Sequence, residues 1–252
     1  MEVVALCGFA FLAGLVDAVA GGGGLIQVPA LFAVFPSLPP PILLGTNKFS
    51  AITGTTIATL RYSWSVPIQW RAVLPAAGIA GIGALAGAKA VTLMDPAVLR
   101  PLLVVLLSGM TVYTLSRPKL GENTDAAPIK QGGTSFFALS AVFGFYDGFF
   151  GPGAGSVMMF ALVRWFGYDF LRAAATTKVL NVATNFGALV LFMLTGNVLY
   201  AVALPMAAFN VAGGFVGAHF AVRQGSRFIR IVFLVVVVAL VVKVSVDVLK
   251  SL

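Results

Sequence analysis

The chain has 252 residues, of which 60% are hydrophobic and 10% are charged, and its mean hydropathy is +1.02. Soluble chains carry roughly 25% charged residues, so this composition excludes a soluble fold and indicates an integral membrane protein. The net charge of +8 comes from basic residues that stand singly between apolar runs, which indicates membrane orientation and no nucleic-acid partner. With Cys7 the only cysteine and His219 the only histidine, a disulfide framework and the usual zinc sites are excluded, and redox or metal chemistry is not expected.

Apolar runs follow one another along the whole chain. A helix needs about 20 apolar residues to cross the hydrocarbon. The runs cover 3–35, 41–60, 67–91, 98–115, 134–163, 171–195, 198–221 and 228–249. The fold class is therefore an all-α polytopic membrane protein. The only polar linker of any length, 116–133, separates a first membrane repeat at 1–115 from a second at 134–252.

The first run has a competing interpretation as a signal peptide. Residues 3–20 are apolar, and Ala18-Val19-Ala20 mimics a small-residue cleavage site. The segment before them contains Glu2 and no Lys or Arg, which is the wrong charge for a signal peptide. We therefore keep the first run as part of the mature protein.

An internal repeat emerges when the sequence is shifted by 130 residues. Scarce residue types then coincide without a gap: Asp17 with Asp147, Gly21 with Gly151, Gly23 with Gly153, Thr46 with Thr176, Lys48 with Lys178 and Pro75 with Pro205. The pairs Gly83/Gly87 and Gly213/Gly217 also coincide, and their four-residue spacing predicts close helix packing.

The first run of each repeat is interrupted by glycines, at 20–24 and 150–155. If each interrupted run is a discontinuous or re-entrant helix that returns to its starting face, three spanning helices follow in each repeat, and the repeats are inverted. Most basic residues outside the two motif lysines then lie on one side: Arg61, Arg71, Arg117, Lys119, Lys130, Arg164, Arg172, Arg223, Arg227 and Arg230. Lys89, Arg100, Lys243 and Lys250 are left opposite, and the positive-inside rule predicts that both termini are periplasmic.

Four ionisable residues inside apolar runs are the first candidates for function. Burying each costs about 2.5–3.5 kcal/mol on insertion scales. Lys48 and Lys178 lie among Thr and Asn residues, and Lys178 shares a helix face with Asn181 and Asn185. Asp17 and Asp147 each precede a glycine break by four residues, and we expect them to couple protons or to balance the lysine charge.

The glycine breaks are candidate anion sites. A helix that restarts after glycines presents free N–H groups and the positive end of its dipole, and glycine lets a ligand approach the backbone. Two such helix starts and two ammonium groups favour a small anion. The predicted substrate-binding residues are Gly21, Gly22, Gly23, Gly24, Asn47, Lys48, Gly151, Gly153, Gly155, Thr177, Lys178, Asn181 and Asn185.

Each candidate also has a purely structural interpretation. The lysines could extend to a membrane interface, the aspartates could form salt bridges without a transport role, and the glycines could be a packing notch. These alternatives stay open at the level of the sequence.

The sequence resembles the TauE/SafE family of sulfite and organosulfonate exporters, also called the toluene sulfonate uptake permease family. The resemblance rests on GLVDAVAGGGGLIQVPAL and LGTNKFSAITGT, with their second-half echoes FGFYDGFFGPGAGS and ATTKVLNVATN. It covers nearly the whole chain and implies an inner-membrane transporter of sulfur-containing anions without a cofactor. The family motifs fall on Asp17, Gly21 to Gly24, Asn47, Lys48, Asp147, Gly151, Gly153 and Lys178; Thr177 stands where the first half has Asn47.

We therefore expect a bacterial multi-pass inner-membrane transporter, not an enzyme, that exports sulfite or an organosulfonate, driven by protons or membrane potential. Its expected partners are the small anion and the lipid bilayer, and a homodimer is compatible with the sequence. The alternatives are an accessory membrane protein without transport and an intramembrane aspartyl hydrolase that uses Asp17 and Asp147. The hydrolase is disfavoured because a Gly-x-Gly-Asp run is absent.

Overall fold

A computed structural model describes residues 2–95, 97–99, 102, 105 and 133–251. In these ranges the regular structure is helical, without strands. The helices are α1 (Glu2–Ala20), α2 (Gly24–Val34), α3 (Pro40–Ser63), α4 (Trp70–Leu93), α6 (Thr134–Phe149), α7 (Ala154–Phe166), α8 (Phe170–Leu194) and α9 (Tyr200–Ser251). The predicted run at 98–115 and the polar loop at 116–133 lie almost entirely outside the described residues.

The lengths and compositions of the helices fit a multi-pass membrane protein. Among the helices that the structure describes, four are long and apolar enough to cross a bilayer: α1, α4, α8 and α9 as far as Ile229. At a rise of 1.5 Å per residue, α2 and α7 span only about 17 and 20 Å, against about 30 Å of hydrocarbon. Helix α3 has 24 residues but is less apolar, because Thr, Asn, Ser and Lys side chains follow its buried face.

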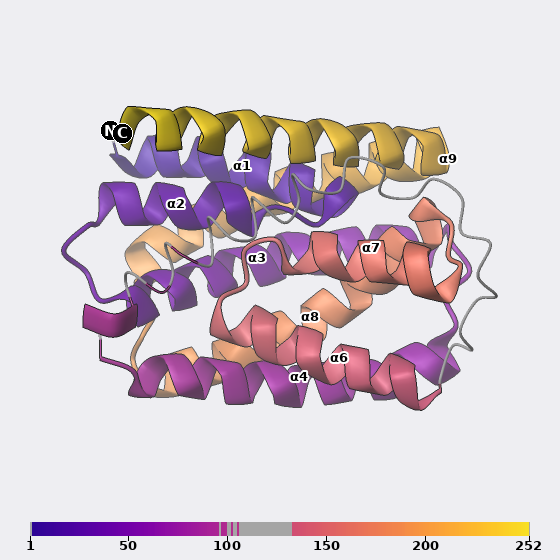
Figure 1. The fold of residues 1–252 in the computed structure, drawn as a ribbon, viewed down its shortest axis with the longest axis horizontal. Coiled ribbons are helices and arrows are strands. Elements are labelled where there is room, and N and C mark those ends of the chain that lie inside the picture. Colours follow the sequence, from indigo (N-terminus) through magenta and orange to yellow (C-terminus); the bar gives the residue numbers. More distant parts are fainter. Residues whose placement is uncertain (1, 96, 100–101, 103–104, 106–132, 252) are drawn as a thin grey trace.

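The helices lie lengthwise along the molecule, and equivalent helices of the two halves run in opposite directions. In Figure 1, α1 and α3 run from left to right, whereas α6 and α8 run from right to left. Helices α2, α3 and α4 begin at Gly24, Pro40 and Trp70, and α7, α8 and α9 begin 130 residues later in each case. The offset found in the sequence is therefore also the offset between helix starts.

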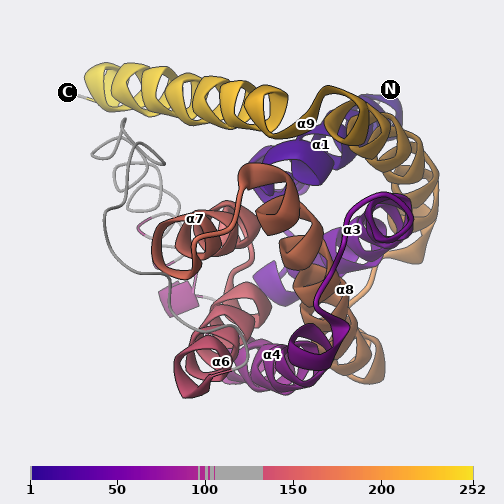
Figure 2. The same cartoon turned by 90° about the vertical axis from the view of Figure 1, so that its right-hand side faces the viewer.

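Helices of one half pack mainly on helices of the other half. Helix α1 packs on α9, and its counterpart α6 packs on α4; α3 also packs on α9, and α8 on α4. Helices α3 and α8 pack on each other. Viewed along the long axis, α1 lies beside α9 and α6 lies beside α4 (Figure 2). Each half thus makes its largest helix contacts with the other half.

Glycines make these contacts close, as their spacing predicts. A Cβ atom built at Gly83 would stand 2.7 Å from the backbone oxygen of Ala141 in α6. Gly87 faces the α6 backbone in the same way, and Gly213 and Gly217 face the α1 backbone. The predicted packing role of both glycine pairs is confirmed.

Each glycine break is a turn between two antiparallel helices (Figure 1). The first turn has Gly21 at φ 76°, and the second has Gly151 at φ 91° and Gly153 at φ 78°. This left-handed conformation favours glycine, since other residues clash there. A further turn at Gly225, φ 74°, reverses α9, so the predicted runs at 198–221 and 228–249 are the two arms of α9 (Figure 1).

Candidate functional site

The two glycine turns, one from each half, touch at the centre of the structure. A Cβ atom at Gly21 would stand 2.5 Å from the carbonyl carbon of Gly155, and one at Gly24 would stand 3.1 Å from the Cα of Pro152. Ser156 ties the turns together: its hydroxyl donates to Ala20 O at 2.7 Å, and its N–H donates to Gly21 O at 3.2 Å. The glycines therefore do form a packing notch, as the structural alternative proposed.

Each buried lysine pairs with an aspartate of the other half. Lys48 Nζ in α3 lies 2.9 Å from Asp147 Oδ1 in α6. Lys178 Nζ in α8 lies 2.7 Å from Asp17 Oδ2 in α1. Because the 130-residue offset relates Lys48 to Lys178 and Asp17 to Asp147, the two pairs are the same contact made twice, with the halves exchanged.

Burial and further hydrogen bonds hold both pairs in place. The Lys48 and Lys178 side chains are 4% and 1% exposed, which contradicts the alternative that they extend to a membrane interface. Lys48 also donates to Asn185 Oδ1 at 3.1 Å, and the Thr184 hydroxyl donates to Asp147. The aspartates do form salt bridges, and the two of them bind different lysines instead of sharing a proton as a hydrolase dyad would.

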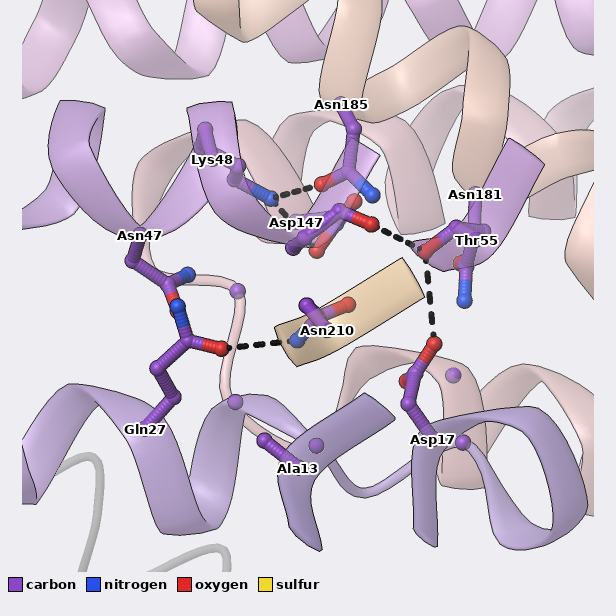
Figure 3. Close-up of a pocket in the computed structure, with 16 residues that line it drawn as sticks. Ala13, Asp17, Gln27, Asn47, Lys48, Thr55, Asp147, Asn181, Asn185 and Asn210 are labelled. Carbon is purple, nitrogen blue, oxygen red and sulfur yellow. Dashed lines mark hydrogen bonds and ion pairs between the residues drawn. The ribbon is translucent and has the colours of Figure 1, made fainter. Parts of the chain in front are cut away.

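A small cavity with a volume of about 30 Å³ lies between the glycine turns and the lysine pairs (Figure 3). The residues predicted for the site that line it are Asp17, Gly21, Gly23, Gly24, Asn47, Lys48, Asp147, Gly151, Gly155, Asn181 and Asn185. The other lining residues are Ala13, Gln27, Ala51, Thr55 and Asn210. Both halves contribute to the wall.

Four predicted site residues do not line this cavity: Gly22, Gly153, Thr177 and Lys178. Lys178 is buried behind Asp17: its ammonium pairs with the Asp17 carboxylate, and Asp17 lines the cavity. Thr177 is 1% exposed, and Gly153 supplies the left-handed residue before α7.

The two helix starts differ in what they offer a ligand. In α2 the first helical N–H donors are Leu25, Ile26 and Gln27, which bond to Gly22 and Gly23. The N–H groups of Gly23 and Gly24, ahead of them, belong to residues on the cavity wall. At α7 the Ser156 N–H already donates to Gly21 O, so the start of α2 is the more open of the two.

Sequence reasoning missed the amides Gln27 and Asn210 and the hydroxyl of Thr55. Gln27 and Asn210 are 1% and 3% exposed, and each is a lone polar residue inside an apolar run. The rule that flags charged residues in a membrane would have found them if it had been applied to amides as well. The Thr55 hydroxyl donates to Ala51 O at 2.7 Å and lies 3.4 Å from Asp17 Oδ2. Thr55 resembles the many other Thr residues of its helix, so nothing in the sequence distinguishes it.

The chain is similar in sequence to a family of membrane transporters and to several of its members. Residues 6–244 match the family described as "Sulfite exporter TauE/SafE". The "Probable membrane transporter protein ORF9" of Sinorhizobium sp. is 36% identical over 241 residues, which cover 94% of this chain and 90% of the relative. The "Probable membrane transporter protein YfcA" of Escherichia coli K12 is 34% identical over 238 residues, covering 94% and 87%.

A "Probable membrane transporter protein" of Haemophilus influenzae is 35% identical over 222 residues, covering 87% of this chain and 85% of the relative. No solved structure matches. The family match across nearly the whole chain and the identity to these relatives agree with the long apolar helices described above. The chain belongs to the TauE/SafE family of membrane transporters.

Proposed function

We propose that this protein is a secondary transporter that exports a sulfur-containing anion, sulfite or an organosulfonate, across the inner membrane, coupled to protons or to the membrane potential. The observation that carries the proposal is the buried Lys48 ammonium on the wall of a central cavity. An ammonium has three protons, and Lys48 donates to Asp147 and Asn185. Within the described part of the chain, one donor is therefore left for an anion.

The surroundings of Lys48 support an anionic solute. The backbone of Gly23 and Gly24 lines the same cavity at the positive end of α2. An arriving anion would compete with Asp147 for Lys48, and a proton taken up by the released carboxylate would couple the two movements.

The arrangement of the helices supports alternating access between two inverted repeats. The helix starts repeat at an offset of 130 residues, equivalent helices run in opposite directions (Figure 1), and the lysine pairs cross between the halves. In transporters built from inverted repeats, the site lies where the two repeats meet and one repeat moves against the other. Exchange of the Lys–Asp pairs would accompany that movement.

The charges at the two ends of the molecule support an orientation. The α3–α4 connection, the α7–α8 connection and the Gly225 turn gather at one end (right in Figure 1), and Arg61, Arg71, Arg164, Arg172 and Arg227 lie in or beside them. By the positive-inside rule this end is cytoplasmic. The opposite end, where α1 begins, is then periplasmic.

Flux measurements on purified protein in liposomes test the function. We expect wild-type protein to move labelled sulfite or a labelled organosulfonate, and Lys48→Ala to abolish that movement. Arg172→Ala is the matched control, because Arg172 is half exposed and pairs with Asp169 far from the cavity. Equal flux in wild type and Lys48→Ala would contradict the proposed site, and peptide cleavage without flux would support a hydrolase instead.

A further inference from the structure

The cavity has a second polar wall that the ion pairs do not explain. Figure 3 shows the amides of Gln27, Asn47 and Asn210 on one side, and Lys48, Asp147 and Asn185 on another. At the 130-residue offset, Gln27, Asn47 and Asn210 correspond to Val157, Thr177 and Ala80. The ion pairs are duplicated in the two halves, but this amide wall exists once.

A chain of hydrogen bonds fixes the orientation of the Gln27 amide. Asn210 Nδ2 donates to the backbone oxygen of Ala10 at 3.0 Å, which can only accept, so this side of the Asn210 amide must be its nitrogen. The same Nδ2 donates to Gln27 Oε1 at 3.1 Å. Gln27 must therefore present its oxygen to Asn210 and its nitrogen elsewhere.

This orientation leaves unused hydrogen-bonding groups in the wall. Gln27 Nε2 and Asn47 Oδ1 have no hydrogen-bond partner within the described residues, although Gln27 is 1% exposed and Asn47 4%. Buried polar atoms in proteins are nearly always paired, and those that are not call for a ligand or water. One of these two atoms is a donor and the other an acceptor.

We infer that Gln27, Asn47 and Asn210 form a subsite for a neutral group that both accepts and donates hydrogen bonds, such as a hydroxyl or an amide, on the same solute whose anionic group meets Lys48. This inference rests on the proposed function and narrows its substrate class. The solute is a short organosulfonate with a polar substituent. Fully ionised sulfite has acceptors only and would leave Asn47 Oδ1 without a donor.

Three probes test the subsite by their affinity for purified protein in detergent: sulfite, ethanesulfonate and 2-hydroxyethanesulfonate. The last two differ by one hydroxyl. We expect the hydroxylated sulfonate to bind at least about 10-fold more tightly than ethanesulfonate, because a site built around a hydroxyl discriminates against the analogue that lacks it. We expect sulfite to bind more weakly than the hydroxylated sulfonate.

Gln27→Met then removes the fixed donor at nearly constant volume. We expect it to abolish the preference for the hydroxyl while ethanesulfonate keeps its affinity within about 2-fold, a tolerance below the cost of one lost hydrogen bond. Gln69→Met, the same change at an exposed position before α4, is the control and leaves the preference intact.

The remaining outcomes separate the two claims. Equal affinity of wild type for the two sulfonates, or tightest binding of sulfite, overturns the subsite and leaves the anion transporter standing. An equal loss of affinity for both sulfonates in Gln27→Met also overturns the subsite, because Gln27 then acts through packing. Binding of none of the three probes overturns the proposed function and the subsite together.

Discussion

At the scale of single residues, the central feature is that Lys48 and Lys178 are each neutralised by a carboxylate from the other half of the chain. A buried pair is close to neutral in its net effect on stability, but removing one partner leaves an uncompensated charge in a low-dielectric interior. The pairs therefore lock the halves together only while both members are charged.

Breaking one pair should be far more damaging than breaking a surface pair. We expect Lys48→Met to lower the free energy of unfolding by about 3–5 kcal/mol, because it leaves the Asp147 carboxylate buried without its lysine. The double variant Lys48→Met/Asp147→Leu should recover part of this loss. Thermal unfolding in detergent of these two variants and of Asp147→Leu, analysed as a double-mutant cycle, measures both effects.

Arg172→Met supplies the comparison for that cycle. Arg172 and Asp169 are about half exposed and 3.6 Å apart, so their pair contributes less than about 1 kcal/mol. Similar small losses in Lys48→Met and Arg172→Met would contradict the burial of the Lys48–Asp147 pair.

Substitutions at Gly151 and Gly196 separate the effect of backbone strain from the effect of an added side chain near Lys48. Gly151 has φ 91°, and a Cβ atom there would stand 3.2 Å from Lys48 Nζ; Gly196 has φ 70° and would place its Cβ in open space. We expect Gly151→Ala and Gly196→Ala each to lose about 1–2 kcal/mol of stability from the left-handed backbone, and only Gly151→Ala to weaken anion binding. Equal binding in the two variants would remove Gly151 from the site.

Sequence reasoning located the charged residues of the site but not their partners. Lys48, Lys178, Asp17 and Asp147 stand out because charge is scarce in apolar runs. Which amine meets which carboxylate depends on how the halves dock, a tertiary property that spacing along one helix does not contain. The same limit explains why Lys178 was expected on the cavity wall and instead lies behind Asp17.

At the scale of secondary-structure elements, the glycine turns define where helices end. The break expected at 20–24 lies between the end of α1 at Ala20 and the start of α2 at Gly24. Gly23 lies against its own partner helix: a Cβ atom there would stand 2.6 Å from Ala13 O and 2.7 Å from Asp17 Cβ. A side chain at Gly23 therefore pushes α2 away from α1.

We accordingly expect Gly23→Val to reduce both transport and thermal stability. The added side chain disrupts the α1–α2 contact, which lowers stability, and it displaces Asp17, which lowers transport. Gly78→Val in α4 is the matched control, because nothing lies within 4 Å of a Cβ atom at Gly78. Flux in liposomes and unfolding in detergent should be measured on the same preparations. Loss of flux at wild-type stability would show that the added side chain obstructs the solute path instead.

At the scale of the whole molecule, the positions at which most helices begin could be predicted from the sequence. The offset of 130 residues predicts the observed helix starts because each half of the chain has its own turn signals: α7, α8 and α9 begin 130 residues after α2, α3 and α4. The shape of the cavity could not be predicted, since Gln27 in α2 and Asn210 in α9 are 183 residues apart in the chain.

The orientation in the membrane can be tested with single cysteines. In a Cys7→Ala background, we expect Ser37→Cys, in the α2–α3 connection, to react with a membrane-impermeant maleimide added to whole spheroplasts. Ser65→Cys, in the α3–α4 connection, should react only after the membrane is opened. Both positions are exposed and lie at opposite ends of the helices (Figure 1). The reverse labelling pattern would place the basic end outside.

The reciprocal lysine–aspartate pairs have an electrical consequence. With two amines balanced by two carboxylates, the two buried ion pairs among the described residues carry no net charge. The transmembrane field, which acts on one elementary charge with about 2.3 kcal/mol per 100 mV, therefore exerts little net force on them. A univalent anion that binds alone adds one negative charge to this site, and a proton that binds with the anion cancels that charge. The membrane potential should therefore hardly alter the rate at which the empty transporter returns to its starting conformation. It should drive the substrate-bound transition only when the anion is transported without a proton.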